Sequence, residues 1–389
     1  MARRDEARGS GTQCGGRGMR ILLVQPRFPL PTGPRRSTHL PIGLLKIAAY
    51  HRHEGDQVGL VEYPRPGPFT PHEVKITSLF TYWSAHVWEA VRHYRALYPK
   101  ARIEVGGIYA SLMPDHCKQS GCDHVEVGLY RGGVAEDLEP AYDLVDADFQ
   151  VIHASRGCAR HCGFCGAWRI EPKVTYRKSV TDLITKRRVL FYDNNLLANP
   201  HIDSILQELS EFRLPDGRTV QCESQCGFDA RLLTPRRAKA LKQARFRQPR
   251  IAWDGPYSEW PDVKEAVGLL EGAGCSRRDM YIFMVYNHDI LYSEMKEKLE
   301  ACGRWGVRVA DCRFRPLDAT SDGYRPGPKP QEDGAYYVHP GWTDAQVRRF
   351  RRNVRHQNIA IMLRLPQNRY VQGCEQRLVG KPWRAGSGR

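Results

Sequence analysis

The sequence predicts an α/β protein with a doubly wound parallel sheet at its amino terminus and an incomplete β/α barrel after it. Two observations support this fold class. Short apolar runs alternate with helical patterns along most of the chain, as they do in parallel sheets. The alternation is interrupted once, at residues 136–149, which predicts a linker between two domains. A chain of 389 residues, 41% of them hydrophobic, is long enough to bury a core in each.

The first series, residues 20–135, follows a polar leader at residues 1–19. Its four predicted strands are apolar runs bounded by turn residues, namely RILLVQP (20–26), DQVGLVEY (56–63), VKITSLFTYW (74–83) and ARIEVGG (101–107). Helical patterns at residues 41–55 and 88–99 lie between strands. Gly106 and Gly107 end the fourth strand, at the edge where such sheets bind ligands. Glycine at a strand end is equally typical of a plain turn.

The second series, residues 150–318, contains six predicted strands with helical patterns between most of them. The strands are QVIHAS (150–155), VLFYDN (189–194), VQCESQ (220–225), RIAWDG (250–255), MYIFMVY (280–286) and VRVADCRF (307–314). These repeats predict a partial (β/α)6 barrel. Polar residues gather where its strands end, at Ser155, Arg156, Asp193, Asn194, Asn195, Glu223, Asp254, Asn287, His288 and Arg313. In β/α barrels this edge carries the functional residues.

The last segment, residues 319–389, is predicted to be an extension with a basic helix that begins near Asp344. Val347, Phe350 and Val354 give the helix an apolar stripe for docking, so its arginines are expected to face solvent. The chain carries a formal charge of +16, and residues 341–389 contain eleven Lys or Arg against two acidic residues. This excess indicates either a solvated helix face with a frayed terminus or a surface that attracts nucleic acid.

The cellular compartment is predicted from what the sequence lacks. It has no apolar run of 18 residues and no apolar signal-peptide core at its start. We therefore expect a cytoplasmic protein with no membrane partner. Because thiols stay reduced there, the twelve cysteines are expected to be ligands, free thiols or core residues.

Three of these cysteines, Cys158, Cys162 and Cys165, lie within eight residues, directly after the first strand of the second series. A structural zinc site needs four ligands, usually two close pairs, and the looser pair Cys222 and Cys226 lies on a predicted strand. A disulfide would leave one thiol over and is disfavoured by the compartment. Three thiolates in a glycine-rich loop suit a cubane iron–sulfur cluster in which the protein leaves one iron unligated.

The segment CARHCGFC (158–165) resembles the C-x-x-x-C-x-x-C signature of radical S-adenosylmethionine (radical SAM) enzymes, including the aromatic Phe164 before the last cysteine. The resemblance implies that Cys158, Cys162 and Cys165 hold a [4Fe–4S] cluster whose fourth iron binds SAM. It also implies reductive cleavage of SAM to a 5′-deoxyadenosyl radical, with a flavodoxin or ferredoxin as reductant. Phe164 would shield the cluster or contact the adenine of SAM.

The resemblance extends over nearly the whole chain. Residues 151–165, 191–209 and 227–235 are similar to the branch of radical SAM proteins that has an amino-terminal cobalamin-binding-type domain. Residues 20–26, 40–62 and 103–107 resemble that domain, which is Rossmann-like, and Gly106 and Gly107 lie in its cofactor edge. The D-x-H-x-x-G motif of ordinary cobalamin proteins is absent, because His39 lacks the preceding Asp. Some relatives bind the corrinoid without this motif, so cobalamin stays an open possibility.

The resemblance also suggests further ligands of SAM. Where many family members have a G-G-E-like motif at the end of the second strand, this chain has Asp193 and Asn194, which would accept a hydrogen bond from the SAM ammonium. Glu223 would bind the SAM ribose or the substrate. Arg231 would meet the SAM carboxylate, with an ion pair to Asp229 as the structural alternative.

Three classes of function follow from these expectations. The leading hypothesis is a radical SAM enzyme that functionalises a C–H bond of a small molecule or natural-product precursor, by methyl transfer, rearrangement or oxidation. The second is a radical SAM enzyme that modifies RNA, suggested by the basic carboxyl terminus. The third is a non-enzymatic iron–sulfur protein with a redox or structural role.

Overall fold

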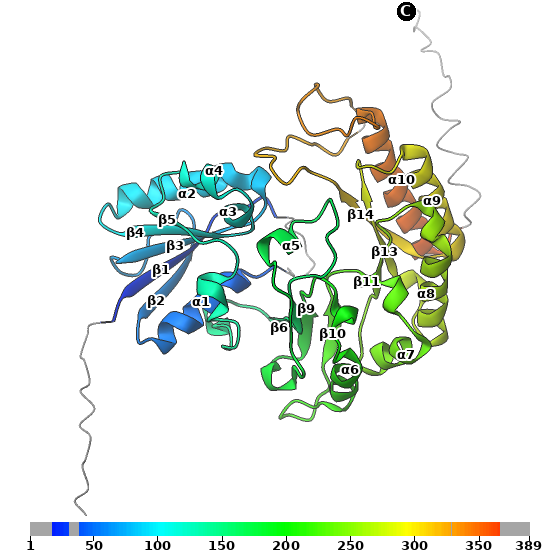
Figure 1. Ribbon diagram of the computed structural model, residues 1–389, viewed down its shortest axis with the longest axis horizontal. Helices are drawn as coiled ribbons and strands as arrows, with labels where there is room; N and C mark the ends of the chain where they lie inside the picture. The colour runs from blue at the N-terminus through cyan, green and yellow to red at the C-terminus, as the bar shows by residue number, and fades with distance from the viewer. Residues whose placement is uncertain (1–17, 31–38, 328, 366–389) are drawn as a thin grey trace, which may run out of the picture.

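The computed structural model describes residues 18–30, 39–327 and 329–365. The predicted leader at residues 1–19 lies almost entirely outside this range, and so does the basic end of the chain, residues 366–389. Within the range, two parallel-stranded units lie next to each other, the first in blue and cyan and the second from green to orange (Figure 1). This arrangement confirms the predicted fold class.

The amino-terminal unit is a doubly wound sheet with the strand order β2-β1-β3-β4-β5. All neighbouring strands pair in parallel. The strands are β1 (Arg20–Gln25), β2 (Gln57–Glu62), β3 (Glu73–Ser78), β4 (Arg102–Gly107) and β5 (His124–Val125). In this order the ligand crevice of the fold lies beyond the carboxyl ends of the strands.

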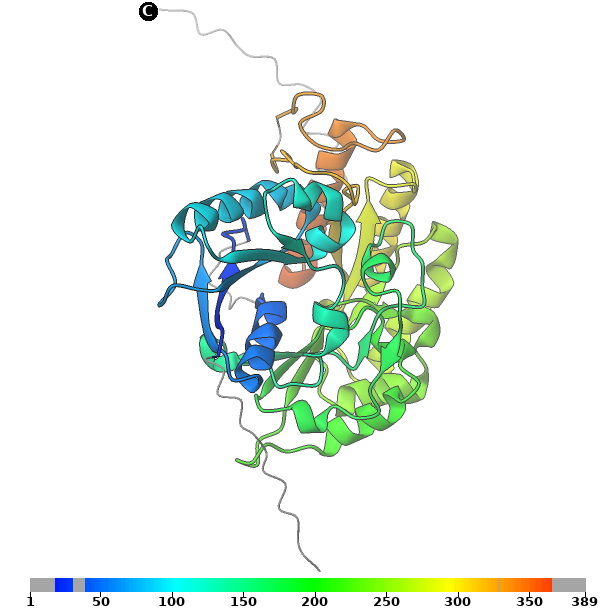
Figure 2. The same ribbon diagram turned by 60° about the vertical axis from the view of Figure 1, so that its left-hand side comes forward.

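Helices cover both faces of this sheet (Figures 1 and 2). Helix α1 lies on one face and helix α2 on the other, and each buries its own set of apolar side chains from the sheet. Because successive strand residues point to opposite faces, Leu22 and Val24 pack under α2 while Ile21 and Leu23 pack under α1. The helices are α1 (Ile42–His53), α2 (Ser84–Leu97), α3 (Ile108–Leu112) and α4 (Pro114–Lys118).

The second unit contains the six predicted strands, arranged as two parallel sheets with the orders β10-β9-β6 and β11-β12-β13-β14. They form an arc with helices on its outer side and an open inner side (Figure 1). The short β11 joins the second sheet in addition to the predicted strands. The strands are β6 (Phe149–Ile152), β9 (Arg188–Phe191), β10 (Gln221–Ser224), β11 (Phe228–Asp229), β12 (Arg250–Ala252), β13 (Tyr281–Tyr286) and β14 (Arg308–Arg313).

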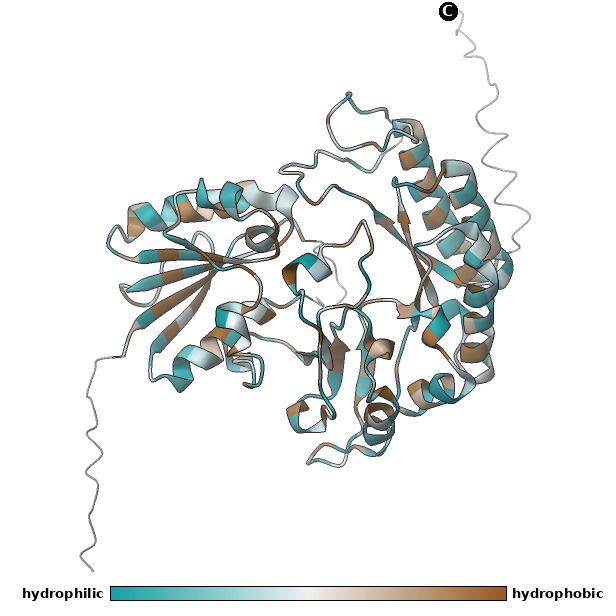
Figure 3. Ribbon diagram, viewed as in Figure 1, coloured by the Kyte–Doolittle hydropathy of each residue, from teal (hydrophilic) through white to brown (hydrophobic). Residues whose placement is uncertain are grey.

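The outer helices of this unit begin and end at recognisable local signals. Thr234 caps α7 by accepting a hydrogen bond from the Arg237 N–H, and Pro235 follows at the first helical position. Helix α9 ends at Gly306, whose φ of 70° is left-handed. The helices are α5 (Ala167–Ile170), α6 (Ile202–Glu211), α7 (Pro235–Gln243), α8 (Trp260–Gly272), α9 (Tyr292–Trp305) and α10 (Asp344–Leu363). Brown, apolar residues lie along the strands that these helices cover (Figure 3).

The basic helix α10 begins at Asp344 as predicted, with a capping box formed by Thr343 and Gln346. Its stripe of Val347, Phe350 and Val354 is buried against the barrel, which confirms the predicted docking.

The expectation that the arginines of α10 all face solvent is wrong. Arg348 is only 5% exposed and pairs with Asp344 at 2.6 Å. Arg351 approaches Asp311 of β14 at 3.6 Å. Burying a guanidinium requires an acidic partner, and both partners are present. Fewer arginines of this helix are therefore available to a polyanion.

The segment predicted as a linker packs closely on both units. Glu136 pairs with Lys46 of α1 at 2.6 Å, and Asp143 pairs with Arg52 at 2.8 Å. Leu40 and Ile42, at the start of α1, pack against apolar residues of β6 and β9. The amino-terminal unit thus covers part of the open side of the barrel.

No helix in the described part of the chain is long and apolar enough to cross a membrane.

Candidate functional site

The three clustered cysteines lie on a loop that follows β6 at the carboxyl-terminal edge of the barrel. A two-residue ladder between β7 (Ser155–Arg156) and β8 (Thr175–Tyr176) closes the base of the loop. Gly157 begins the loop with a φ of +73°, and a Cβ there would lie 2.6 Å from the Lys173 carbonyl oxygen. Only glycine fits so close an approach, which explains why the motif has glycine at position 157.

The thiols of Cys158, Cys162 and Cys165 are half-buried and free. Two backbone N–H groups already point at sulfur atoms, from Arg160 to Cys158 Sγ and from Ala167 to Cys165 Sγ, each at 3.4 Å. Such bonds stabilise thiolates and tune the clusters that thiolates hold. The donor set therefore fits an iron–sulfur cluster with three protein ligands.

Asp193, predicted as a ligand of the SAM ammonium, supports the base of the cysteine loop. The residue is completely buried. Its carboxylate accepts hydrogen bonds from the Ala154 N–H and from both the N–H and the hydroxyl of Ser155. Burial raises the pKa of Asp193 to about 6 in spite of these donors. Because the described donors already occupy both oxygens, its contacts are those of a positioning residue, and the role toward SAM stays a prediction.

A second support of the loop is Glu171, which the sequence did not single out. Its Oε2 accepts a hydrogen bond from the Gly157 N–H at 2.7 Å, and its Oε1 pairs with Arg156 at 3.0 Å. Arg156 also approaches Glu136, which pairs with Lys46 of the amino-terminal unit. This chain of charges connects α1 with the start of the cysteine loop.

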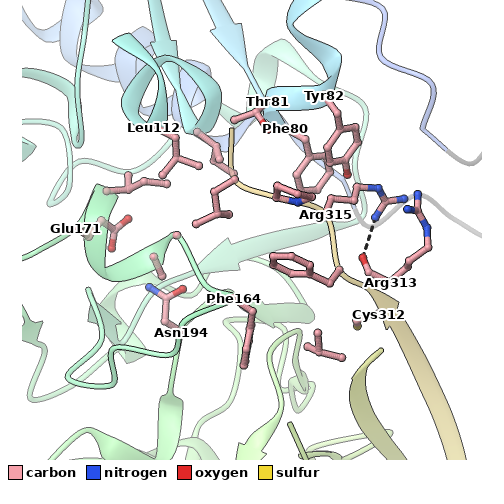
Figure 4. A pocket seen from close by; sticks show the side chains of 18 residues that line it. Phe80, Thr81, Tyr82, Leu112, Phe164, Glu171, Asn194, Cys312, Arg313 and Arg315 are labelled. Atoms are coloured by element: carbon pink, nitrogen blue, oxygen red, sulfur yellow. Dashed lines mark hydrogen bonds between the residues drawn. The ribbon is translucent and has the colours of Figure 1, made fainter. Parts of the chain in front are cut away.

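Phe164 and Asn194 line the wall of a cavity next to the cysteine loop (Figure 4), and their predicted contacts with SAM stay predictions. Asn194 donates to the Gly157 carbonyl at 3.3 Å. The Phe164 ring packs edge-on to His288 at a centroid distance of 6.0 Å. Phe164, which is part of the loop, and Asn194, which is bonded to it, therefore both border the cavity.

The cavity lies between the two units and has a volume of about 410 Å³. Phe80, Ile108 and Leu112 line it from the amino-terminal unit, and Phe314 and Leu317 line it from the end of the barrel. This size and apolar character are typical of small-molecule sites. Because its walls come from the carboxyl edges of both units, the cavity forms only when the two units are packed together.

The far wall of the cavity is held by the extension after β14. Arg315 stacks on the ring of Tyr82 in the amino-terminal unit at 4.6 Å and pairs with Asp322 at 2.5 Å. Arg313 pairs with the same carboxylate. In Figure 4 the side chain of Arg313 extends away from the cavity, and its guanidinium lies over the ring of Tyr324. Arg313 therefore stabilises the wall from behind.

The remaining predicted residues lie apart from the cavity. Glu223 pairs with Arg188 and Arg250 at 3.5 and 3.4 Å. Arg231 is half-exposed and bonds to Asp229 at 2.9 Å, the structural alternative that the sequence suggested. Neither residue lines the cavity among the described residues, and their roles toward SAM stay predictions.

Gly106 and Gly107 end β4 at the edge that faces the cavity. Gly107 has a φ of +103°, and a Cβ there would lie 2.3 Å from the Ser78 carbonyl oxygen of β3. This close approach explains why the residue is glycine. The predicted contact of both glycines with a cofactor stays a prediction.

Arg160, inside the cysteine motif, is an anchor of the cysteine loop. It is exposed on one side, yet its Nη1 lies 2.6 Å from the Asp229 carboxylate. The chain places Arg160 and Asp229 69 residues apart, so the motif itself carried no signal for this pairing.

Two further residues, Cys312 and Asp254, also lie at this edge of the barrel. Cys312 is exposed to the cavity. The position of Asp254 at a strand end was visible in the sequence, but its distance to the cysteine loop was not.

No family model matches the sequence, and no curated protein matches it. Among solved structures, the chain is similar to TsrM from Kitasatospora setae, a radical SAM methyltransferase determined with cobalamin and a [4Fe–4S] cluster bound. The TM-score is 0.56 at 15% sequence identity, and the match covers 78% of this chain and 77% of that one. At this identity the likeness concerns the fold. The chain therefore shares its two-unit α/β fold with a radical SAM methyltransferase.

Proposed function

We propose that the chain is a radical SAM enzyme that acts on a small-molecule or natural-product substrate bound between its two units. One arrangement carries the proposal: Cys158, Cys162 and Cys165 lie in a braced loop at the carboxyl edge of an open parallel barrel, next to a cavity of small-molecule size. In β/α barrels this edge holds the reacting groups. The fold shared with a radical SAM methyltransferase supports the same function.

The residues of the loop would hold a [4Fe–4S] cluster through the three cysteine sulfurs. A cluster bound there supplies one-electron transfer into SAM, which breaks a sulfur–carbon bond and yields a 5′-deoxyadenosyl radical, with a flavodoxin- or ferredoxin-type protein as electron donor. Asp193 and Glu171 hold the ends of the loop, and Asn194 holds the Gly157 carbonyl. Phe164 and the apolar cavity walls keep water away from the reacting groups.

We extend the proposal to a corrinoid bound at the amino-terminal unit. Phe80, Ile108 and Val127 follow the neighbouring strands β3, β4 and β5 and are 41%, 38% and 55% exposed. Large apolar side chains exposed at the ligand edge of a doubly wound sheet suit a bulky, partly apolar cofactor. A corrinoid there would carry a methyl group, which favours methyl transfer over rearrangement or oxidation.

SAM turnover tests the first part of the proposal. The protein would be purified anaerobically, reconstituted with iron and sulfide and reduced with dithionite. We expect 5′-deoxyadenosine from radical cleavage, or S-adenosylhomocysteine from methyl transfer. Cys162→Ala should lose both products. Cys275→Ala, a matched control whose thiol lies after α8 outside the loop, should keep them. Equal release by wild type and Cys162→Ala would show that the radical SAM function is wrong.

Retention of a corrinoid tests the second part. After incubation with hydroxocobalamin and gel filtration, the wild type should keep the corrinoid absorption bands. Ile108→Glu places a charge at the proposed corrinoid surface and should lose them. Leu97→Glu, at the far end of α2 with a similar exposure of 43%, should keep them. A corrinoid that elutes separately from wild type would count against cobalamin and leave the cluster proposal standing.

A further inference from the structure

Asp254 follows β12 at the same barrel edge as the cysteine loop. Its Oδ1 accepts a hydrogen bond from the Val285 N–H at 3.2 Å, and Val285 lines the cavity. The Asp254 charge acts on the thiols of Cys312, in the cavity wall, and of Cys165, in the loop. Through this hydrogen bond the carboxylate lies directly behind a residue of the cavity wall.

The backbone on both sides of Asp254 is held by a lysine. Lys298 of α9 is completely buried, and its Nζ donates to the carbonyl oxygens of Trp253 and Gly255, each at 2.8 Å. The lysine ammonium also lies 4.9 Å from the centroid of the Trp253 ring. Lys298 thus fixes the two residues that flank Asp254, and carbonyl oxygens take up its hydrogen bonds.

Asp254 differs from Asp229 and Glu223 at this edge because it has no ion pair among the described residues. Asp229 pairs with Arg160 and Arg231, and Glu223 pairs with two arginines. Burial raises the pKa of Asp254 to about 6, so the group is mostly ionised at neutral pH. One side of the carboxylate stays partly exposed, and the charges of Lys298 and Arg160 lower its pKa without forming an ion pair with it. A cation brought by a ligand would form the close ion pair that Asp254 lacks.

We propose that Asp254 binds the ammonium group of an amine whose apolar body occupies the cavity between the two units. Leu112, Phe164 and Phe314 offer the apolar contacts for that body. Arg313 and Arg315, the arginines among the residues that line the cavity, share the carboxylate of Asp322. The proposal rests on the proposed function in taking the amine as the substrate of that site. The methionine part of SAM carries the same group, and the test separates the two sources.

Calorimetric binding of three matched probes tests the ammonium site on the reconstituted protein under anaerobic conditions. The probes are 2-phenylethylamine, 2-phenylethanol and 3-phenylpropionate, which share a ring and differ in charge. Wild type should bind the amine at least about tenfold more tightly than the others, as expected for a buried charge pair. Asp254→Asn, which keeps the shape and the acceptor for Val285, should bind the amine and the alcohol equally. A wild type without preference for the amine overturns the proposal whatever the variants do.

Asp311→Asn is the matched control. Asp311 is also a carboxylate with a pKa raised by burial, but it pairs with Arg351 of α10 on the outer side of the barrel. This variant should keep the amine preference. A loss of preference in both variants would mean that neutralising any buried acid disturbs the site, and the assignment to Asp254 would fall.

Binding of SAM in the same variants identifies the source of the ammonium. If Asp254→Asn removes the amine preference and leaves SAM affinity unchanged, the substrate carries the group. If SAM affinity falls at least about tenfold and the amine preference stays, the group belongs to SAM and the substrate assignment is wrong. SAM turnover by wild type alone decides the proposed function separately, because that assay contains no added amine substrate.

Discussion

The Glu171 carboxylate accepts a hydrogen bond from the Gly157 N–H at 2.7 Å and so closes a loop that contains all three clustered cysteines. Glu171 directly follows the short helix α5, and Gly157 directly precedes Cys158. The bond therefore fixes both ends of the segment that would surround a cluster. Arg156, paired with the other oxygen of Glu171 at 3.0 Å, holds the carboxylate in place.

We expect Glu171→Ala to lower the iron content after reconstitution. The variant removes a charge-assisted bond worth about 1.5–3 kcal/mol and leaves the loop open. Glu171→Gln keeps an oxygen for the Gly157 N–H and should retain most of the iron with an altered electron paramagnetic resonance signal of the reduced cluster. Iron analysis and this spectrum are the measurements. Equal iron content in Glu171→Ala and wild type would show that the loop keeps its shape without the bond from Gly157 to Glu171.

Asp193→Asn is expected to destabilise the barrel by about 1–3 kcal/mol, because an amide N–H₂ would replace an oxygen that accepts from Ser155 and leave buried donors facing each other. The free energy of unfolding in urea measures the effect. Asp216→Asn serves as control, since Asp216 pairs only with its neighbour Arg218 on the surface and should change stability by less than about 0.5 kcal/mol. Similar losses in the two variants would contradict the role of Asp193.

Gly107→Ala should unfold at a clearly lower denaturant concentration than wild type. Its Cβ would collide with the Ser78 carbonyl oxygen, and its φ of +103° is unfavourable for alanine. Overpacking of this kind costs about 1–3 kcal/mol. Gly43→Ala is the opposite case, because Gly43 lies inside α1 with no atom within 4 Å of an added Cβ. It should stabilise the chain by about 0.4–1 kcal/mol.

The contribution of His153 to stability should fall as the pH decreases from 7 to 6. Burial, and then the charges of Arg156, Lys46 and Arg177, hold the pKa of His153 well below 6.5. The unfolded chain binds a proton below pH 6.5 and the folded chain does not, so folding loses up to about 1.4 kcal/mol per pH unit from this group. Asp193 and Asp254 have the opposite sign, since their pKa values of about 6 favour the folded state at lower pH.

Comparison with His153→Gln isolates this contribution from that of the carboxylates. The thermal midpoint of the variant should change less between pH 7 and 6 than that of wild type, because the variant has no imidazole to protonate at this position. Identical pH profiles would mean that His153 takes up its proton in the folded state.

Much of the fold could be predicted because strands and helices leave periodic patterns within a single segment. The four longer strands of the first unit, the six barrel strands and the start of α10 at Asp344 were all visible in this way. The strands β5 and β11 were missed, because two residues are too short to show a period. The orientation of Arg348 was also missed, since its partner Asp344 decides it.

By itself, the sequence determined the alternation that makes two parallel-stranded units and the spacing of Cys158, Cys162 and Cys165 in one loop. Both are local properties, written within a few turns of chain. Only the tertiary structure decided which partners the acids at the barrel edge bind. Asp193 binds Ser155 across 38 residues and Arg160 binds Asp229 across 69, whereas Asp254 is left without a cation among the described residues. For Asp254 what is lacking is an ion pair, since Lys298 and Arg160 still act on its charge. Such pairings depend on distances between strands that are far apart in sequence, and no local pattern records those distances.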